Sequence, residues 1–72
     1  MVNLNKLKLK IFENGMNVSQ LAEKIGVDRS TLYRKFQKNG DSISIKEANL
    51  MVKTLHLTVE EANAIFFSNY VA

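Results

Sequence analysis

Apolar residues recur along this chain at intervals of three and four positions, which is the spacing of one face of an α-helix. No stretch alternates apolar and polar residues for long enough to predict a strand, and the chain contains no proline. Glycine, asparagine and capping residues divide the pattern into five short helical segments. We therefore expect an all-α fold in which residues 1–72 form one compact domain, with no linker or internal repeat.

Three of these segments have simple apolar stripes. The stripe of the first expected helix, which a glycine at position 15 would end, consists of Leu4, Leu7, Ile11 and Phe12. The stripe of the fourth consists of Ile45, Ala48, Met51, Val52 and Leu55. The stripe of the fifth consists of Val59, Ala62, Ile65 and Phe66. Ser44 with Glu47, and Thr58 with Glu61, have the spacing of capping boxes that open the fourth and fifth helices.

The second and third expected helices are joined by a very short connection. Asn17 can cap the free N–H groups of the second helix, and a glutamine three positions later completes a capping-box pair. Gly26 ends this helix after two turns, and we expect its backbone to need a positive φ. Asp28 then caps a third helix over residues 28–38. A joint this tight sets two helices at a steep angle, the geometry of a helix-turn-helix spanning Val18 to Gln37.

Small and branched apolar side chains are placed to fill the space between these two helices. We expect the two helices to cross most closely at Ala22, where a larger side chain would force them apart. The other positions expected in this shared core are Leu21, Ile25, Val27, Leu32 and Phe36.

Charge is distributed unevenly along the chain. Residues 1–40 contain eight lysine and arginine residues against three acidic residues, a net charge of +5. Residues 41–72 contain two basic residues against four acidic ones, a net charge of −2. A basic half beside a mildly acidic remainder favours a face that meets a polyanion.

The composition argues against several classes of protein. Without cysteine the chain cannot form disulfides, a zinc ribbon or a thiolate nucleophile. The single histidine, His56, has no evident second metal ligand, and the chain has neither a glycine-rich phosphate loop nor carboxylates paired for catalysis. No apolar run approaches the roughly 18 residues of a membrane span, and the first residues lack a secretion signal. We expect a cytoplasmic protein that is not an enzyme and has no cofactor, metal or small-molecule substrate.

The segment GMNVSQLAEKIGVDRSTLYRKF, Gly15 to Phe36, resembles the helix-turn-helix of the Cro and phage-repressor-like (XRE-type) family. The closing segment LTVEEANAIFF, Leu57 to Phe67, is similar to the last helix of small phage-type regulators. The resemblance implies a five-helix lambda-repressor-like domain acting as a bacterial or phage repressor on double-stranded operator DNA. This sequence departs from the family at Val18, where many members carry a phosphate-binding glutamine, and at Lys35, which stands at a core position.

The third helix would supply the residues that touch DNA. With its apolar side chains turned inward, its outward side carries Arg29, Ser30, Tyr33 and Arg34, and the resemblance places base-reading residues at these positions. Arginine suits this task because its fork matches the O6 and N7 atoms of guanine. The residues expected to contact phosphates are Asn17, Thr31, Lys35 and Lys38. Considered alone, the two lysines are also compatible with a solvated face.

The C-terminal segment carries more apolar side chains than one stripe of a short helix can bury. Either the tail folds back over the first helix, or an exposed aromatic patch forms a dimer surface. We favour a homodimer, with Phe66, Phe67 and Tyr70 as interface candidates. A two-fold dimer would present its recognition helices about 34 Å apart to a palindromic operator.

Two other interpretations remain open at this point. Because fold does not determine function, the domain could be a protein-interaction module, antitoxin-like or an anti-repressor partner, without base-specific readout. It could also be part of a longer recombinase or repressor, although the start of the sequence and the lack of a terminal linker favour a small complete protein.

Overall fold

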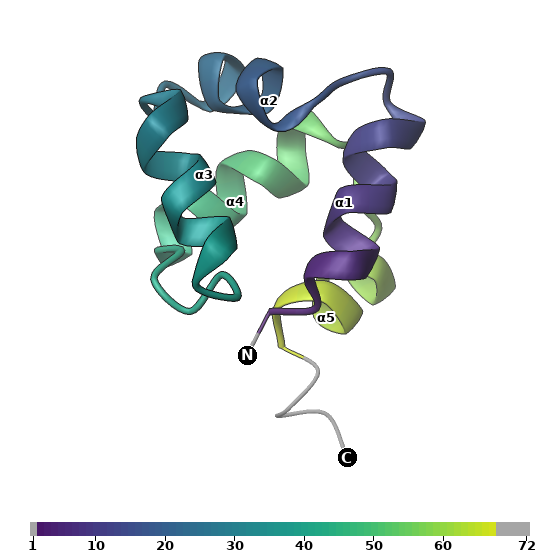
Figure 1. The fold of residues 1–72 in the computed structure, drawn as a ribbon. Coiled ribbons are helices and arrows are strands. Elements are labelled where there is room, and N and C mark those ends of the chain that lie inside the picture. Colours follow the sequence, from purple (N-terminus) through teal and green to yellow (C-terminus); the bar gives the residue numbers. More distant parts are fainter. Residues whose placement is uncertain (1, 68–72) are drawn as a thin grey trace.

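The computed structural model describes residues 2–67, and these residues form five α-helices without any strand. The helices are α1 (Leu4–Glu13), α2 (Val18–Ile25), α3 (Arg29–Gln37), α4 (Ile45–Thr54) and α5 (Val59–Phe66). In Figure 1, α2 lies across the top, with α3 descending on one side and α1 on the other. The all-α fold and the five helices predicted from the sequence are confirmed.

Helix starts are fixed by local hydrogen bonds, because the first N–H groups of a helix have no partner within it. The Gln20 N–H donates to Asn17 Oδ1 (2.8 Å), while the Asn17 N–H donates to Gln20 Oε1 (2.9 Å). The capping boxes predicted at the starts of α4 and α5 have the same reciprocal pair of bonds. The Asp28 carboxylate accepts from the Thr31 N–H (3.3 Å) at the start of α3. Every predicted cap is therefore present.

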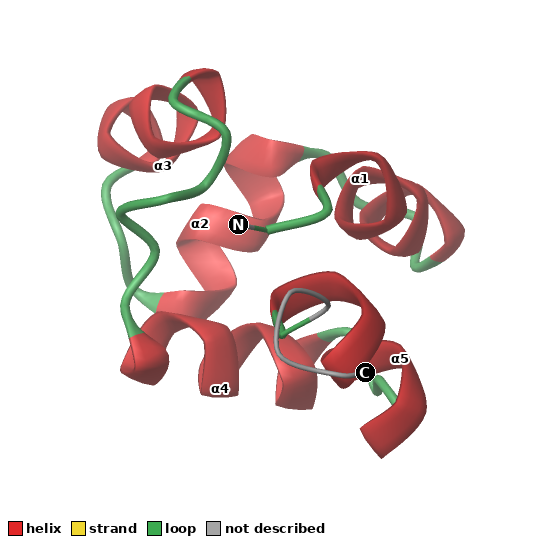
Figure 2. Ribbon diagram, turned by 90° about the horizontal axis from the view of Figure 1, so that it is seen from below, coloured by secondary structure: helices red, strands yellow, loops and turns green. Residues whose placement is uncertain are grey.

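The core lies where α2 meets its neighbours. α2 packs against α1, α3 and α4, whereas α5 packs against α1. Figure 2 shows the same arrangement from below, with α1, α3 and α4 placed around α2. The buried side chains are Leu7, Ile11, Leu21, Ala22, Ile25, Leu32, Phe36, Ala48, Met51, Leu55, Ile65 and Phe66. The core predicted for α2 and α3 is confirmed, with Val27 partly buried at its edge.

Three residues assigned to the apolar stripes are exposed instead. Phe12 is 77% exposed, Ile45 74% and Val59 77%. Phe12 follows buried Ile11 and is turned about 100° away from it around the helix, since a turn takes 3.6 residues. Ile45 and Val59 each directly follow an N-cap. Helical side chains lean toward the N-terminus, so these two project past the end of their helix and away from the core.

The end of α5 also differs from the expected dimer surface. Phe66 is only 7% exposed and belongs to the core cluster together with Ile65. Phe67 is 43% exposed. Tyr70, the third interface candidate, lies outside the described residues. Of the three candidates, Phe67 is thus the described residue that offers surface to a partner.

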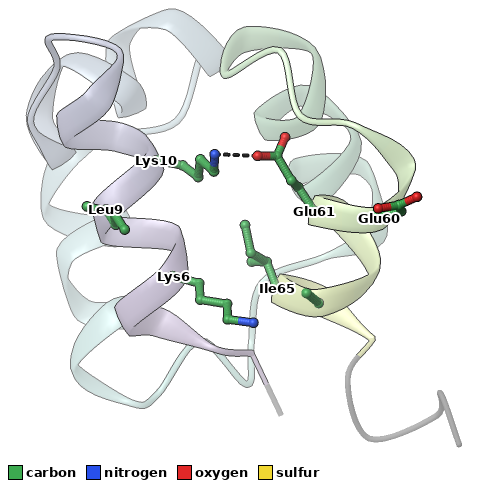
Figure 3. Close-up of a pocket in the computed structure, with 7 residues that line it drawn as sticks. Lys6, Leu9, Lys10, Glu60, Glu61 and Ile65 are labelled. Carbon is green, nitrogen blue, oxygen red and sulfur yellow. Dashed lines mark ion pairs between the residues drawn. The ribbon is translucent and has the colours of Figure 1, made fainter.

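α1 is tied to the C-terminal part of the fold at both of its ends. The Asn3 N–H donates to the Ile65 carbonyl (2.7 Å), and Asn14 Nδ2 donates to the Leu55 carbonyl (3.3 Å). Between them, Lys10 forms an ion pair with Glu61 across the α1–α5 groove, as Figure 3 shows. Hydrogen bonding to Glu61 raises the pKa of Lys10, and the same bond lowers the pKa of Glu61.

The loop between α3 and α4 approaches the N-terminal segment closely at Gly40. Its φ is +73°, and a Cβ placed there would lie 3.0 Å from Val2 Cβ and 3.3 Å from Ile43 Cδ1. Gly26, in the turn between α2 and α3, has a similar φ of +75°, but a Cβ there would meet nothing within 4 Å. The two glycines share a backbone requirement and differ in their surroundings.

We expect Gly40→Ala to destabilise the protein more than Gly26→Ala. Both substitutions place a side chain in the left-handed region, at a cost of about 1–2 kcal/mol. Only Gly40→Ala also crowds a neighbouring side chain, which adds about 1–3 kcal/mol. Denaturant unfolding followed by circular dichroism measures both free energies, and Val2→Ala should relieve part of the Gly40→Ala loss. Equal losses at the two glycines would contradict the close approach.

Candidate nucleic-acid interface

α2, the turn and α3 form a helix-turn-helix whose bounds are those expected from the sequence, Val18 to Gln37. The turn is short because Gly26, at φ +75°, ends α2 and Asp28 caps α3 two residues later. The Val27 N–H donates to the Ala22 carbonyl (3.0 Å), which closes the end of α2. Ala22 is fully buried, as its small size at the helix crossing predicted.

α3 separates an anchored face from an exposed one. Leu32 and Phe36 are 0% and 6% exposed and hold the helix on the core. The four residues predicted to read bases are all exposed: Arg29, Ser30, Tyr33 and Arg34. The helix sequence RSTLYRKFQ contains three cationic residues and no acidic one. Its outer face can therefore approach a polyanion without repulsion from acidic side chains of its own.

A shallow depression of about 180 Å³ lies beside α3 and the loop that follows it. Its lining residues are Thr31, Arg34, Lys35, Lys38 and Ser42. Cationic and hydroxyl groups are the donors that phosphate oxygens accept from in proteins. The first four of these residues were each predicted from the sequence to contact DNA, and the structure brings them together. Ser42 was missed, since it follows the end of α3 in a loop whose path has no periodic signal.

A second depression, of about 340 Å³, lies where the N-terminal ends of α2 and α3 meet. It is lined by Asn17, Ser19, Gln20, Glu23, Val27 and Arg29. Asn17 Oδ1 already accepts from the Gln20 N–H, so its Nδ2 hydrogens are the donors that its side chain could offer a phosphate. Six of the eight predicted contact residues therefore line one or the other of these two depressions, whereas Ser30 and Tyr33 line neither.

Lys35 has a different partner from the phosphate expected for it. Its ammonium group donates to both carboxylate oxygens of Glu47, at 2.8 and 2.9 Å. The two side chains are only 21% and 14% exposed. Glu47 was recognised in the sequence as the capping residue of α4, but nothing in the pattern of residues connected it with Lys35. The charge of Lys35 is thus neutralised within the protein.

Two opposing effects act on the pKa of Glu47. Burial acts to raise this pKa, but hydrogen bonds from the Lys35 ammonium and the Ser44 backbone N–H outweigh it. The pKa of Glu47 is consequently held below its ordinary value of 4.5. The carboxylate remains ionised at neutral pH, which keeps Lys35 attached to α4.

A comparison with known families gives the class of the site. Residues 6–39 match a family model described as the helix-turn-helix domain of resolvase, over just under half of the chain. With the geometry of α2 and α3, the match supports a helix-turn-helix DNA-binding domain. It does not single out the Cro and phage-repressor-like (XRE-type) family that the sequence resembles. No curated protein and no solved structure matches the chain.

Two further findings concern residues 2–67 alone. Within this part of the chain, no group of three or more histidine, cysteine, aspartate or glutamate side chains could hold a metal ion. No helix among the described residues is long and apolar enough to cross a membrane.

Acid should weaken the fold partly through Glu47. Because its pKa is lower in the folded protein than in the unfolded chain, its stabilising effect is present above pH 4.5 and is lost as the pH falls through the folded pKa. We expect Glu47→Gln to be less stable at pH 7, by about 1.5–3 kcal/mol for a charged hydrogen bond. Its stability should also decline less than that of the wild type between pH 5 and pH 3. Denaturant midpoints at several pH values test this, and an equal loss of stability in both proteins over this pH range would refute it.

Proposed function

We propose that this protein is a sequence-specific regulator of transcription, a repressor that occupies double-stranded operator DNA with α3 inserted in the major groove. It would act in the cytoplasm of a bacterium, at the nucleoid. The observation that carries the proposal is the division of α3, which is anchored by buried Leu32 and Phe36 and turns two arginines, a serine and a tyrosine outward. The helix-turn-helix match over residues 6–39 supports DNA as the partner.

Base reading is assigned to the outer face of α3. Arg29 and Arg34 can each form a bidentate pair with guanine, worth about 1–3 kcal/mol of discrimination. Tyr33, 44% exposed, can pack its ring on a thymine methyl group. Ser30 is short enough to accept several bases at its position. The two arginines therefore supply most of the proposed selectivity.

Register on the DNA is assigned to contacts with phosphates. Thr31, Lys38 and Ser42 line the depression beside α3, and Asn17 lines the one at the start of α2. These groups would fix the height and tilt of α3 in the groove without reading sequence. Lys35 is left out of this set, because its ammonium is bonded to Glu47.

A homodimer on a palindromic operator completes the proposal. Two-fold related recognition helices would meet half-sites about 34 Å apart. Phe67, 43% exposed at the end of α5, is the described candidate for the contact between subunits. Tyr70 is proposed to join it, and lies outside the described residues.

A second candidate is the DNA-binding part of a resolvase-type protein, which the description of the matching family favours. Both candidates would use α3 in the same way and differ in the consequence of binding. A reporter gene whose promoter overlaps the preferred site separates them. A regulator represses the reporter, whereas occupancy of the site without repression would favour the resolvase-type protein.

Selection from a pool of random duplexes, at low and at moderate salt, tests the proposed function. We expect an enriched inverted repeat, with half-sites one DNA turn apart. Enrichment of a single half-site would contradict the dimer and retain base reading. Retention that is uniform in sequence and collapses with salt would contradict sequence-specific binding. Failure to retain any duplex, together with tight binding to a protein, would favour the interaction module.

Arg34→Ala and Lys38→Ala should weaken binding in different ways, although both residues line the same depression. Arg34→Ala should lower affinity for the selected site about 5- to 150-fold and relax the preference at one base pair. Lys38→Ala should weaken binding to selected and random duplexes alike, and the slope of log affinity against log salt concentration should fall by about 1, the equivalent of one phosphate contact. Titration of both duplexes at several salt concentrations measures this. Equal losses on both duplexes for both variants would remove the assigned roles.

A further inference from the structure

One lysine of α3 is bonded to a neighbouring helix of the protein and does not extend freely into solvent. Lys35 donates from Nζ to both Glu47 oxygens, at 2.8 and 2.9 Å. With side chains 21% and 14% exposed, this pair is more shielded than the Lys10–Glu61 pair, whose side chains are 28% and 32% exposed. Water and salt therefore screen the attraction between Lys35 and Glu47 less strongly.

The carboxylate of Glu47 is itself held in place by the first turn of α4. Its Oε1 accepts from the Ser44 N–H (2.8 Å), and the Glu47 N–H donates to Ser44 Oγ (3.0 Å). α4 is in turn anchored by Ala48 and Met51, which are buried in the core. The acceptor that Lys35 binds is thus a fixed point on a packed helix, and not a mobile surface side chain.

The pair joins two helices that both pack against α2. α2 contacts both α3 and α4, and the Lys35–Glu47 pair adds a direct link between those two helices. Lys35 lies between Arg34, on the outer face, and Phe36, in the core. Any rotation of α3 that moves Lys35 away from Glu47 also moves Arg34 relative to the DNA. Side chains that bind a target specifically need to be held within about 0.5 Å and 10–20° of the geometry in which they bind.

We propose that Lys35 and Glu47 are positioning residues, which fix the rotation of α3 against α4 and thereby determine the sequence selectivity of Arg34 without touching DNA themselves. This inference rests on the proposed base-reading function of α3. Phosphate contacts tolerate small rotations, because long side chains can follow a phosphate, whereas a bidentate contact with a base edge cannot. Losing the pair should therefore reduce selectivity far more than it reduces binding to random DNA.

Glu47→Gln is the direct variant, and Glu61→Gln is its matched control. Glutamine also serves in a capping box, so both variants retain the cap of their helix while losing the charge that attracts a lysine. Glu61 occupies the same capping position in α5 and pairs with Lys10 of α1, on elements other than α3. The two variants remove the same kind of interaction at two places in the fold.

The measurement is the ratio of affinities for the selected duplex and for random duplexes, with folding checked by thermal unfolding. We expect Glu47→Gln to lower the ratio about five-fold or more, the lower end of what one bidentate arginine supplies. Its affinity for random duplexes should stay within about two-fold, since phosphate contacts are retained. Glu61→Gln should leave the ratio unchanged. A Glu47→Gln ratio equal to that of the wild type, or an equal fall in Glu61→Gln, would overturn the proposal.

Variants of Lys35 test the other end of the pair and distinguish positioning from phosphate binding. Lys35→Arg can still bind the Glu47 carboxylate and should keep the ratio, whereas Lys35→Met should lower it as Glu47→Gln does. Equal weakening by Lys35→Met on all duplexes would instead identify Lys35 as a phosphate contact and overturn the proposal. If the wild type itself shows no sequence preference, the proposed function fails and this inference with it. If the wild type is selective and the variants keep its ratio, only the inference fails.

Discussion

The burial of α2 against three other helices is the interaction on which the rest of the structure depends. α2 has only eight residues, a length at which an isolated helix is not stable in water. Its buried side chains, Leu21, Ala22 and Ile25, provide the surface on which α1, α3 and α4 meet. α3 therefore depends on this shared surface for its place in the fold. Ala22, which is fully buried, is small enough to let the neighbouring helices approach α2 closely.

The features that sequence analysis predicted are those that depend on neighbours in the sequence. A cap involves residues three apart, and the left-handed end of α2 needs only Gly26, so both can be recognised without knowledge of the fold. The bounds of the helix-turn-helix follow from these same local signals. The exposed face of α3 follows in turn from Leu32 and Phe36, which are one turn apart and buried.

What could not be predicted depends on residues that the fold brings together. Lys35 and Glu47 are twelve positions apart, and their contact requires a particular path of the loop between α3 and α4. Ile45 and Val59 have the right spacing for an apolar stripe, yet each is the first residue of its helix and is exposed to solvent. Phe66 was expected at a dimer surface, but it is buried in the core. How many apolar side chains of α5 the core can take up depends on the whole fold and cannot be deduced from the spacing within one helix.

The acidic half of the chain also acts on the basic half in a specific way. Glu47 and Glu61 each cap a helix and each accept from a lysine of the N-terminal half, Lys35 and Lys10. An ordinary surface ion pair is weak partly because it must immobilise two long side chains. Here the capping box has already immobilised the carboxylate, so only the lysine loses freedom when the pair forms. The hydrogen bonds that start α4 thus also hold the carboxylate to which Lys35 of α3 is bonded. Through this contact, as proposed above, local capping chemistry would influence the orientation of α3.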